Sequence, residues 1–297
     1  MAAMTPTTSP SVLVTGATGR IGRAVIDRLA HAGVPVRALE HRPGTARNLP
    51  GNVSVVRGDL TVPETLDAAL RGIRTVLLVW AAPPDTAGAV VARLAAHVRR
   101  VVLLSAPHRT DHPFFRQPNP AATLFAELER LIAATGLEST IVRPGMFASN
   151  ALAWWGGAIR GDGVVRWPYG DAETAPVDDR DVAEVLARTL HEDGHAGGDY
   201  VLTGPESLSQ AEQARIAGEA VGRPVRFEEM PPGEFRSQAP EAARPAADML
   251  LAAWKATLGR PAYVTTTVAG LLGSPPRTFR RWATDHAAAF TGAPRRG

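Results

Sequence analysis

A glycine-rich junction between an apolar run and a helical pattern constrains this chain more than any other feature. Residues 12–22 read VLVTGATGRIG, and the helical pattern AVIDRLAHAG follows closely. The turn at Gly16 needs backbone freedom that a Cβ would restrict, Gly19 lets the main chain approach a ligand, and Gly22 lets the helix pack on its strand. N–H groups at the helix start then face an anion. The junction predicts a site for a dinucleotide pyrophosphate.

The first half of the chain alternates short apolar runs with helical patterns. Because such runs are typical of parallel strands that are covered on both faces, the pattern predicts a doubly wound α/β sheet. Thr61 and Glu64 resemble a capping box, and Pro63 suits a first helical turn. The expected strands are 11–15, 35–39, 53–57, 75–80, 100–105 and 138–143, and the expected helices are 20–32, 63–71, 86–97 and 121–135.

The second half changes character, because tryptophans and prolines gather there. We expect a small α+β lobe at 151–297, with 172–203 returning to the main sheet of a dinucleotide-binding domain at 11–150. Segment 231–247 is rich in proline and is expected to be an irregular arm. The patterns further predict helices over 181–191 and 208–221 and strands over 199–203 and 225–229.

Composition narrows the class of protein. Of 297 residues, 45% are hydrophobic and 21% are charged, with no cysteine, so disulfides and thiolate chemistry are excluded. No apolar run is long enough to span a membrane, and residues 1–10 are expected to be a disordered tail, not a signal peptide. The net charge is only +3 and the arginines are scattered, which argues against a nucleic-acid partner. A cytoplasmic location and a small-molecule partner are expected, and a homodimer is left open.

Several motifs together resemble one known family. They are TGATGRIG (15–22), GDLTVPETLDAAL (58–70), RPGMFASN (143–150), APVDDRDVAEVLARTL (175–190) and YVLTGPESLSQAE (200–212). In order and spacing they are similar to the NmrA-like atypical short-chain dehydrogenases/reductases. The resemblance implies an NAD(P)-binding Rossmann fold. The family includes reductases of quinones and triphenylmethane dyes, and also regulators that sense the cofactor without catalysis.

The end of the second expected strand bears on the choice of cofactor. Glu40 stands where an acidic residue would chelate the adenosine ribose diol, which favours NAD(H). Arg20 in the turn and Arg42 beyond the strand are placed to hold a 2′-phosphate. The family usually has arginine where this chain has His41. NADP(H) is therefore slightly favoured over NAD(H), and both stay open.

The expected binding residues form two sets. The cofactor set follows the glycine turn and the ends of the expected strands: Gly16, Thr18, Gly19, Arg20, Ile21, Gly22, Glu40, Arg42, Asp59, Leu60, Trp80, Ala81, Ser105 and Pro144. The substrate set is mostly aromatic: Phe125, Met146, Phe147, Trp154 and Trp155. For the two tryptophans, packing within the lobe or a dimer contact is the alternative.

The Tyr-x-x-x-Lys dyad of the wider superfamily has no counterpart here, so catalytic candidates are sought among other residues. The one lysine is Lys255, with Leu251 four residues before it. Phe125 stands where dye and quinone reductases often have histidine, and Glu129 fits the family's helix glutamate, with an ion-pair role as the alternative. The loop after the fifth strand offers Ser105, His108 and His112 as candidates, against a strand-end hydrogen bond and solvated imidazoles.

Three functions remain open at this point. The favoured one is an enzyme, an NAD(P)H-dependent oxidoreductase that reduces a small aromatic, quinone-like or conjugated carbonyl substrate, plausibly in secondary metabolism. The alternatives are a non-catalytic sensor of NAD(P) redox state and a biosynthetic cyclase or isomerase.

No metal is expected. The stretch HEDGH (191–195) formally matches a zinc-protease motif, but Gly194 argues that the helix ends inside the match. Asp178, Asp179 and Asp181 are better explained as helix N-capping and dipole compensation than as metal ligands.

Overall fold

The computed structural model describes residues 11–291, and the predicted tail at 1–10 lies outside that range. Its chain divides into two compact units, described separately below. The first unit contains the chain up to Ser105, Thr123–Arg143 and Val182–Tyr200, and the second contains Ala106–Ala122, Pro144–Asp181 and the chain from Val201 onward. The division into a cofactor domain and a substrate lobe stays a prediction.

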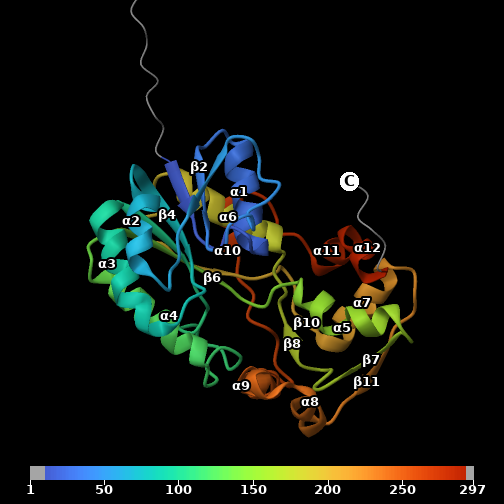
Figure 1. The fold of residues 1–297 in the computed structure, drawn as a ribbon. Helices are drawn as coiled ribbons and strands as arrows, with labels where there is room; N and C mark the ends of the chain where they lie inside the picture. The colour runs from blue at the N-terminus through green and yellow to red at the C-terminus, as the bar shows by residue number, and fades with distance from the viewer. Residues whose placement is uncertain (1–10, 292–297) are drawn as a thin grey trace, which may run out of the picture. The chain divides into compact units, whose positions relative to one another are not determined.

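A seven-stranded sheet forms the centre of the first unit (Figure 1). The strand order is β3-β2-β1-β4-β5-β6-β9, and the five pairs from β3 to β6 are parallel. This order reverses direction between β1 and β4, as in a doubly wound Rossmann sheet, so the fold prediction is confirmed. The strands are β1 (Ser11–Val14), β2 (Val36–Glu40), β3 (Val53–Arg57), β4 (Ile73–Val79), β5 (Arg100–Leu104), β6 (Glu138–Pro144) and β9 (Asp199–Leu202).

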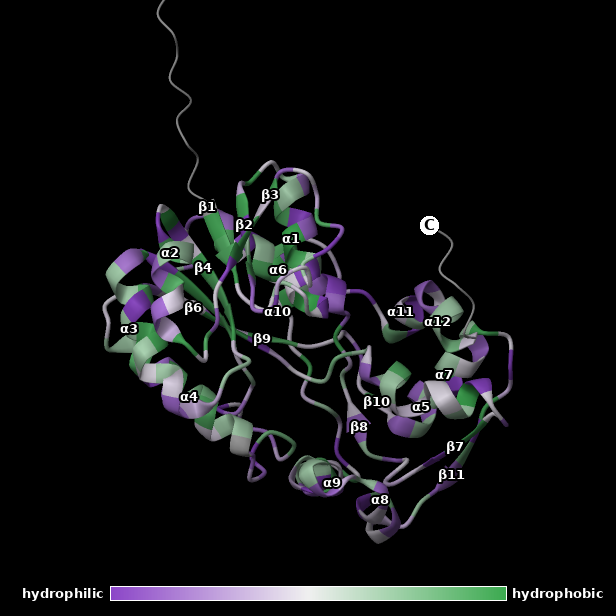
Figure 2. Ribbon diagram, viewed as in Figure 1, coloured by the Kyte–Doolittle hydropathy of each residue, from purple (hydrophilic) through white to green (hydrophobic). Residues whose placement is uncertain are grey.

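Helices cover both faces of this sheet (Figure 1). One face is covered by α2 (Leu66–Leu70), α3 (Ala87–His97) and α4 (Pro120–Ala133), whose leucines and valines join the strands in one core. The other face is covered by α1 (Arg20–His31) and α6 (Asp179–His191), which are joined by an ion pair between Arg28 and Glu184 at 2.9 Å. Figure 2 shows the strands as mostly hydrophobic, as expected for a sheet buried on both sides.

The predicted capping box before α2 is wrong. A 3₁₀ turn, η1 (Pro63–Thr65), precedes α2, and Val62 is its N-cap residue. Because proline lacks an N–H, Pro63 is favoured at the first helical position, and this places the cap at Val62 instead of Thr61. The Thr61 N–H instead binds the Asp59 carboxylate at 2.8 Å.

The second unit is a mixed α+β assembly around its own core. The helices α5 (Asn150–Arg160), α7 (Gln210–Ala220), α11 (Phe279–Asp285) and α12 (Ala287–Thr291) pack on the buried rings of Trp155, Phe279, Trp282 and Phe290. Two short sheets flank them: β7 (Val164–Trp167) with β11 (Arg226–Glu229), and β8 (Glu173–Thr174) with β10 (Leu208–Ser209). A further short helix, α10, spans Thr267–Leu272.

The expectation of an irregular arm over 231–247 is wrong. The segment forms α8 (Pro232–Gln238), the 3₁₀ turn η3 (Glu241–Ala243) and the start of α9 (Arg244–Ala256). Its prolines stand at the N-cap or in the first turn of these elements, where a missing N–H costs no hydrogen bond. Proline here starts helices and does not interrupt them.

Candidate functional site

The glycine turn leaves β1 and enters α1 as the sequence predicted. Gly16 has φ +62°, and the Gly19 N–H donates to the Gly16 carbonyl oxygen at 2.9 Å. A Cβ on Gly16 would lie 3.0 Å from Val79, and a Cβ on Gly22 would overlap the Gly16 carbonyl oxygen. Gly19 is the N-cap residue of α1, whose first turn holds no acidic side chain.

The outer surface of this turn is open. Thr18, Gly19 and Arg20 are exposed, whereas Ile21 in the first turn of α1 is buried. The Thr15 hydroxyl accepts from the Val79 N–H at 2.8 Å and so ties the carboxyl ends of β1 and β4 together at the point where the strand order reverses. A cradle that a Cβ would fill, in front of a helix N-terminus without acidic side chains, fits a pyrophosphate.

Glu40 at the end of β2 organises the loop that follows it. Its carboxylate accepts from the Ala46 N–H at 2.8 Å and from the Gly44 N–H at 3.0 Å. These hydrogen bonds, that from Ala46 foremost, hold the pKa of Glu40 below its ordinary value. Both carboxylate oxygens therefore bind the protein's own main chain, an arrangement that differs from one open to a ribose diol.

The lowered pKa of Glu40 predicts how stability depends on pH. Folding favours the ionised form of Glu40, so this carboxylate stabilises the folded protein at neutral pH. The stabilisation is lost as the pH falls through the lowered pKa. In Glu40→Gln only one of the two main-chain N–H groups keeps an acceptor, so we expect a lower urea unfolding midpoint than wild type at pH 7. The difference between the two midpoints should shrink in acid. Glu64→Gln, an exposed site, is the control. A difference in urea midpoint that widens in acid would contradict this account.

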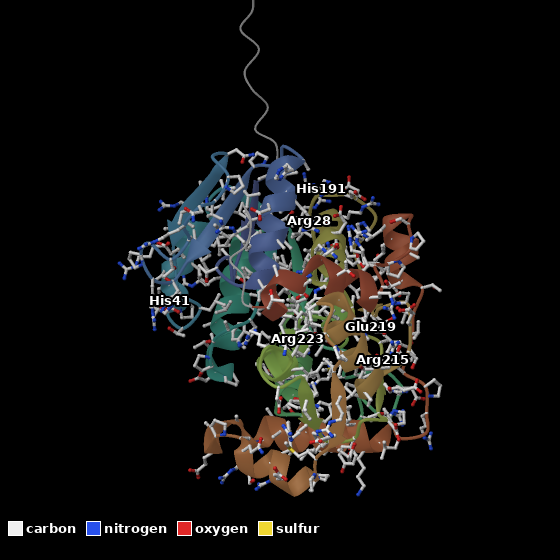
Figure 3. The ribbon with its side chains drawn as sticks, turned by 90° about the vertical axis from the view of Figure 1, so that its right-hand side faces the viewer. Arg28, His41, His191, Arg215, Glu219 and Arg223 are labelled. Atoms are coloured by element: carbon white, nitrogen blue, oxygen red, sulfur yellow. The ribbon has the colours of Figure 1, made fainter. Side chains whose placement is uncertain are left out.

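A pocket of about 450 Å³ lies beyond the ends of β2 and β3. It is lined by His41, Arg57, Gly58, Asp59, Val62 and Thr65. His41 lies at the outer rim of the sheet (Figure 3), and its Nε2 is 3.0 Å from the Asp59 carboxylate. Burial alone would raise the pKa of Asp59, but hydrogen bonds from Thr61 and the nearby His41 lower it. Arg42 is exposed, and Leu60 packs into the core.

Ser105, one of the catalytic candidates, is held within a buried network of the first unit. Its hydroxyl donates to Glu129 Oε1 at 2.6 Å. Arg143 binds the same carboxylate through two nitrogens, at 2.6 and 2.9 Å, and binds Asp199 at 2.6 and 3.0 Å. Burial would lower the pKa of the Arg143 guanidinium, but the hydrogen bonds to Glu129 and Asp199 outweigh it and raise that pKa. Glu129 thus has the ion-pair role that the sequence left open.

The two candidate histidines lie in the second unit. The ring of His108 contacts the Ala106 carbonyl oxygen through Nδ1 at 3.0 Å. His112 Nδ1 accepts from the Phe114 N–H at 3.4 Å, and its Nε2 lies 3.2 Å from the Pro261 carbonyl oxygen. In this pattern Nε2 donates to the Pro261 carbonyl oxygen and Nδ1 accepts.

An aromatic pocket in the second unit includes His112 and Met146. Phe114 and Phe115 contact each other edge to face at 5.1 Å, and Phe115 contacts Tyr263 edge to face at 6.4 Å. The sequence analysis missed Tyr263, and the only signal was its rarity, as one of three tyrosines. The full lining is His112, Phe114, Phe115, Gly145, Met146, Glu173, Thr174, Ala175, Thr203, Ala262 and Tyr263.

The other aromatic candidates lie in different places. Phe125 packs against the core of the first unit, where the Trp80 indole N–H also donates to the Ala82 carbonyl oxygen at 2.6 Å. Ala81 follows Trp80 directly beyond β4, and Pro144 ends β6. In the second unit, Phe147 forms a β-bridge with Val177.

The paired tryptophans belong to an aromatic cluster of the second unit. Trp155 is only 1% exposed, and Trp154 stacks on Trp167 at 5.5 Å and meets Trp254 edge to face at 5.6 Å. These ring contacts fit packing within the lobe, which the sequence analysis gave as the alternative to substrate binding by the two tryptophans.

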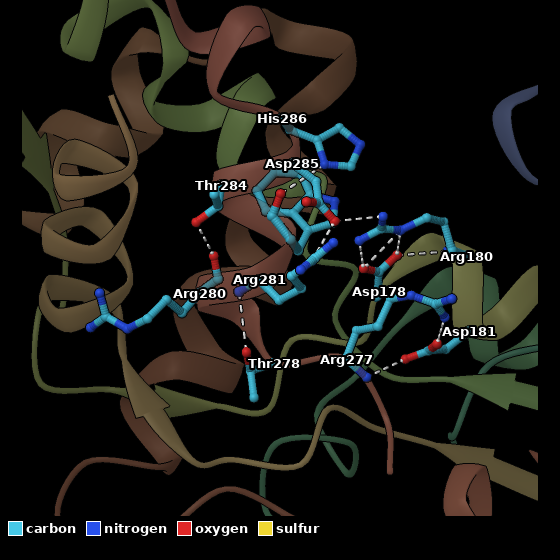
Figure 4. Close-up of polar contacts among 11 residues, drawn as sticks. Asp178, Arg180, Asp181, Arg277, Thr278, Arg280, Arg281, Thr284, Asp285 and His286 are labelled. Atoms are coloured by element: carbon cyan, nitrogen blue, oxygen red, sulfur yellow. Dashed lines mark hydrogen bonds and ion pairs between the residues drawn. The ribbon is translucent and has the colours of Figure 1, made fainter. Parts of the chain in front are cut away.

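Asp178 directly before α6 caps the helix, and Asp181 in its first turn joins it to the segment before α11 (Figure 4). Asp178 accepts from the Arg180 N–H at 2.8 Å, so the N-capping prediction is confirmed. Asp181 accepts from the Arg277 N–H at 2.8 Å and pairs with its guanidinium, while burial raises the pKa of Asp181. α6 ends at His191, so the HEDGH stretch does not continue on that helix.

Residues 11–291 contain neither a cluster of metal-ligating side chains nor a helix that could span a membrane. No group of three or more histidine, aspartate or glutamate side chains in this range is arranged to hold a metal ion. Within the same range, no helix combines the length and the apolar character needed to cross a bilayer.

Comparison with known proteins gives a consistent result. Residues 16–193 match the model of a family described as NAD(P)H-binding. The chain is 41% identical to a (4-alkanoyl-5-oxo-2,5-dihydrofuran-3-yl)methyl phosphate reductase of Streptomyces griseus, over 94% of this chain and 99% of that one. It is 34% identical to an NAD(P)H azoreductase of Xenophilus azovorans, over 95% and 100% of the two chains.

A solved structure extends this likeness to the fold. The NADPH complex of an NADPH-dependent quinone oxidoreductase from Escherichia coli superposes with a TM-score of 0.80 at 25% identity, over 92% of this chain and 99% of the other. With the glycine cradle, the strand order and the family match in agreement, the chain belongs to the NAD(P)H-binding family of Rossmann-fold proteins and is an NmrA-like atypical short-chain dehydrogenase/reductase.

Proposed function

We propose that this protein is an NADPH-dependent reductase of small conjugated carbonyl compounds, a class that includes quinones and unsaturated furanones. The observation that carries the proposal is the 41% identity, over nearly the whole chain, to a reductase whose named substrate is an unsaturated dihydrofuranone that bears a methyl phosphate. An open glycine cradle of the type that binds a dinucleotide supports it. The named activity of the quinone oxidoreductase relative fits the same class, and the azoreductase relative is named for NAD(P)H-dependent reduction of a different acceptor group.

The proposed reduction does not require the protein to supply a strong general acid. NADPH, when bound, would supply a hydride to the carbon of a conjugated carbonyl compound that is remote from oxygen, and a proton from water would complete the reduction. Such an acceptor is reactive without a Tyr-Lys dyad. This is consistent with a chain whose one lysine is Lys255 and whose Ser105 hydroxyl is bound to a buried carboxylate. The protein's own part is then to bind and orient both reactants.

We propose NADPH as the preferred cofactor because of the residues around the end of β2. Both oxygens of Glu40 are bound by main-chain N–H groups of the next loop, so Glu40 is poorly placed to chelate a ribose diol. Arg42 is exposed in that loop and His41 lines the adjacent pocket. A guanidinium here is suited to the doubly charged 2′-phosphate.

Arg42→Ala tests this preference directly. We expect the Kd for NADPH to rise about tenfold, the worth of one charge-assisted hydrogen bond near solvent, while the Kd for NADH stays the same. Calorimetric titration with both cofactors gives the ratio of the Kd for NADPH to the Kd for NADH. Arg71→Ala, an exposed arginine elsewhere in the first unit, is the matched control. Equal losses for NADPH and NADH would contradict the assignment of Arg42 to the 2′-phosphate.

The reductase activity itself is tested by mixing the protein with NADPH and menadione, a neutral quinone, and following the loss of NADPH absorbance. We expect turnover of about 1 per second or faster, within the ordinary range for enzymes. Binding of NADPH without consumption, across a panel of quinones and unsaturated lactones, would overturn the proposal and would favour a redox-sensing role.

A further inference from the structure

His41 and Asp59 meet at the carboxyl edge of the sheet because β2 and β3 stay paired to their last residues. Glu40 lies opposite Arg57 in the parallel register, and the Gly58 N–H donates to the Glu40 carbonyl oxygen at 3.0 Å. His41 and Asp59 come directly beyond these contacts. Their side chains therefore emerge next to each other, with His41 Nε2 at 3.0 Å from the Asp59 carboxylate.

The Asp59 carboxylate is held as an ionised acceptor. It accepts from the Thr61 N–H at 2.8 Å, and the main-chain N–H of Asp59 donates to the Thr65 hydroxyl at 2.9 Å. Burial alone would raise the pKa of Asp59, but the bonds from Thr61 and the neighbouring His41 outweigh it and keep that pKa below its ordinary value. Since an ionised carboxylate can only accept, the facing Nε2 of His41 carries a proton whether the ring is neutral or charged.

The other ring nitrogen of His41 is then the one that changes with protonation. Among the described residues, Nδ1 has no hydrogen-bond partner, and the side chain is 59% exposed. With the proton of the neutral ring on Nε2, Nδ1 presents a lone pair, whereas in the charged ring Nδ1 is a donor. The same atom therefore repels an anionic oxygen in one state and binds it in the other.

His41 also stands where a Rossmann sheet distinguishes its cofactors. The residues at the end of the second strand face the 2′ position of the adenosine ribose, which carries a phosphate in NADP and a hydroxyl in NAD. His41 is the first residue after β2, and it lines the pocket of about 450 Å³ together with Arg57 and Asp59. This pocket leaves room for a phosphate beside the ring.

The other charged groups around this pocket keep their charge near neutral pH. Asp59 and Glu40 have lowered pKa values and stay ionised, and arginines stay protonated. Histidine is the side chain that ordinarily changes charge between about pH 5 and 8. The groups considered are Glu40 on β2, Arg42 in the loop after it, Arg57 and Asp59 at the end of β3, and Glu64 on η1, which is exposed.

We propose that His41 makes the choice between NADP(H) and NAD(H) depend on pH. The protonated ring, oriented by Asp59, donates from Nδ1 to the 2′-phosphate, and the neutral ring offers that phosphate no donor. The inference rests on the proposed preference for NADPH and adds a regulation of the same site. His41 is a specificity-determining residue here, and no step of the reduction is assigned to it.

The ratio of the Kd for NAD⁺ to the Kd for NADP⁺, measured by calorimetry at pH 6.5 and 8.5, tests this regulation. The oxidised cofactors are used because they are stable in acid. We expect a ratio about fivefold larger at pH 6.5, as for one charge-assisted hydrogen bond near solvent. In His41→Gln the ratio should no longer rise in acid. A wild-type ratio that is the same at both pH values would overturn the proposal.

Two further variants isolate the charge of His41. His41→Arg carries a permanent charge and is expected to keep at pH 8.5 the ratio that the wild type shows at pH 6.5. His97→Gln is the matched control, because His97 Nε2 lies 3.2 Å from the Asp67 carboxylate in the same unit but outside the pocket. It should respond to pH as the wild type does. Loss of the pH dependence in His97→Gln, or its persistence in His41→Gln, would contradict the role of His41.

Proton uptake gives a second readout that does not depend on affinity. A bound 2′-phosphate favours the charged ring, so binding of NADP⁺ at pH 7.5 should take up a fraction of a proton, and binding of NAD⁺ should take up less. Calorimetry in two buffers of different ionisation enthalpy measures this uptake. The free phosphate, whose second pKa is about 6, is already ionised at this pH. We expect His41→Gln to abolish the difference between the cofactors, and no difference in the wild type would count against the inference.

These outcomes separate the inference from the function on which it rests. If menadione is reduced with NADPH but the cofactor ratio depends neither on pH nor on His41, the regulation is wrong and the reductase stands. If the ratio follows the protonation of His41 but no acceptor is reduced, the regulation is correct and the proposed activity is wrong.

Discussion

Replacing Gly22 by alanine is expected to reduce the affinity for NADPH by at least about a hundredfold. The new Cβ would overlap the Gly16 carbonyl oxygen, a main-chain atom that cannot rotate away. Relief requires the turn between β1 and α1 to shift, and that shift misplaces the amides that face the pyrophosphate. Such overpacking in a rigid turn typically costs about 1–3 kcal/mol of stability as well. Titration with NADPH, alongside urea unfolding, measures both effects.

Gly88→Ala is the matched control within the same unit. Gly88 lies in α3, and a Cβ there would meet no atom within 4 Å. Since alanine is a better helix former than glycine, this variant is expected to gain about 0.5–1 kcal/mol and to bind NADPH as the wild type does. Wild-type affinity in Gly22→Ala would show that the turn does not hold the cofactor.

Replacing Arg143 by methionine is expected to lower the free energy of unfolding by about 3–5 kcal/mol. The Arg143 side chain is 2% exposed and carries four hydrogen bonds to the carboxylates of Glu129 and Asp199. Without it, the buried Glu129 carboxylate loses two charge-assisted hydrogen bonds, while the Ser105 hydroxyl still donates to it. Urea unfolding at neutral pH measures the loss.

A second arginine–glutamate pair shows what burial contributes. Arg130 binds Glu127 through two nitrogens, at 2.6 and 2.7 Å, but on the exposed surface of α4. Arg130→Met is expected to cost less than about 1 kcal/mol because solvent screens such pairs. The double variant Arg143→Met with Glu129→Leu should recover part of the loss, since no buried charge remains next to Ser105. Equal costs for the two arginine variants would contradict the role given to burial.

The cofactor turn could be predicted from the sequence because its physics is local. Gly16, Gly19 and Gly22 are close in the chain, and their spacing already specifies a strand, a tight turn and a helix start. The helical start of segment 231–247 was predictable in principle, since prolines are favoured in a first helical turn, but the same residues also occur in irregular loops.

The groups around the catalytic candidates could not be predicted in the same way. Ser105, Glu129 and Arg143 are on three different elements, and nothing in their spacing reveals that one hydroxyl and one guanidinium share a carboxylate. Tyr263 and His112 are separated by 150 positions, and their ring contact depends on how the second unit packs.

The sequence by itself determined the parallel sheet, the glycine cradle and the class of cofactor, because hydrophobic periodicity and glycine geometry act over a few neighbouring residues. Tertiary structure alone decided which polar groups are already partnered and which are available to a ligand. Hydrogen bonds such as those of Glu40, Ser105 and Thr203 form only when distant segments meet, so the chemistry left for a substrate becomes visible only in the folded chain.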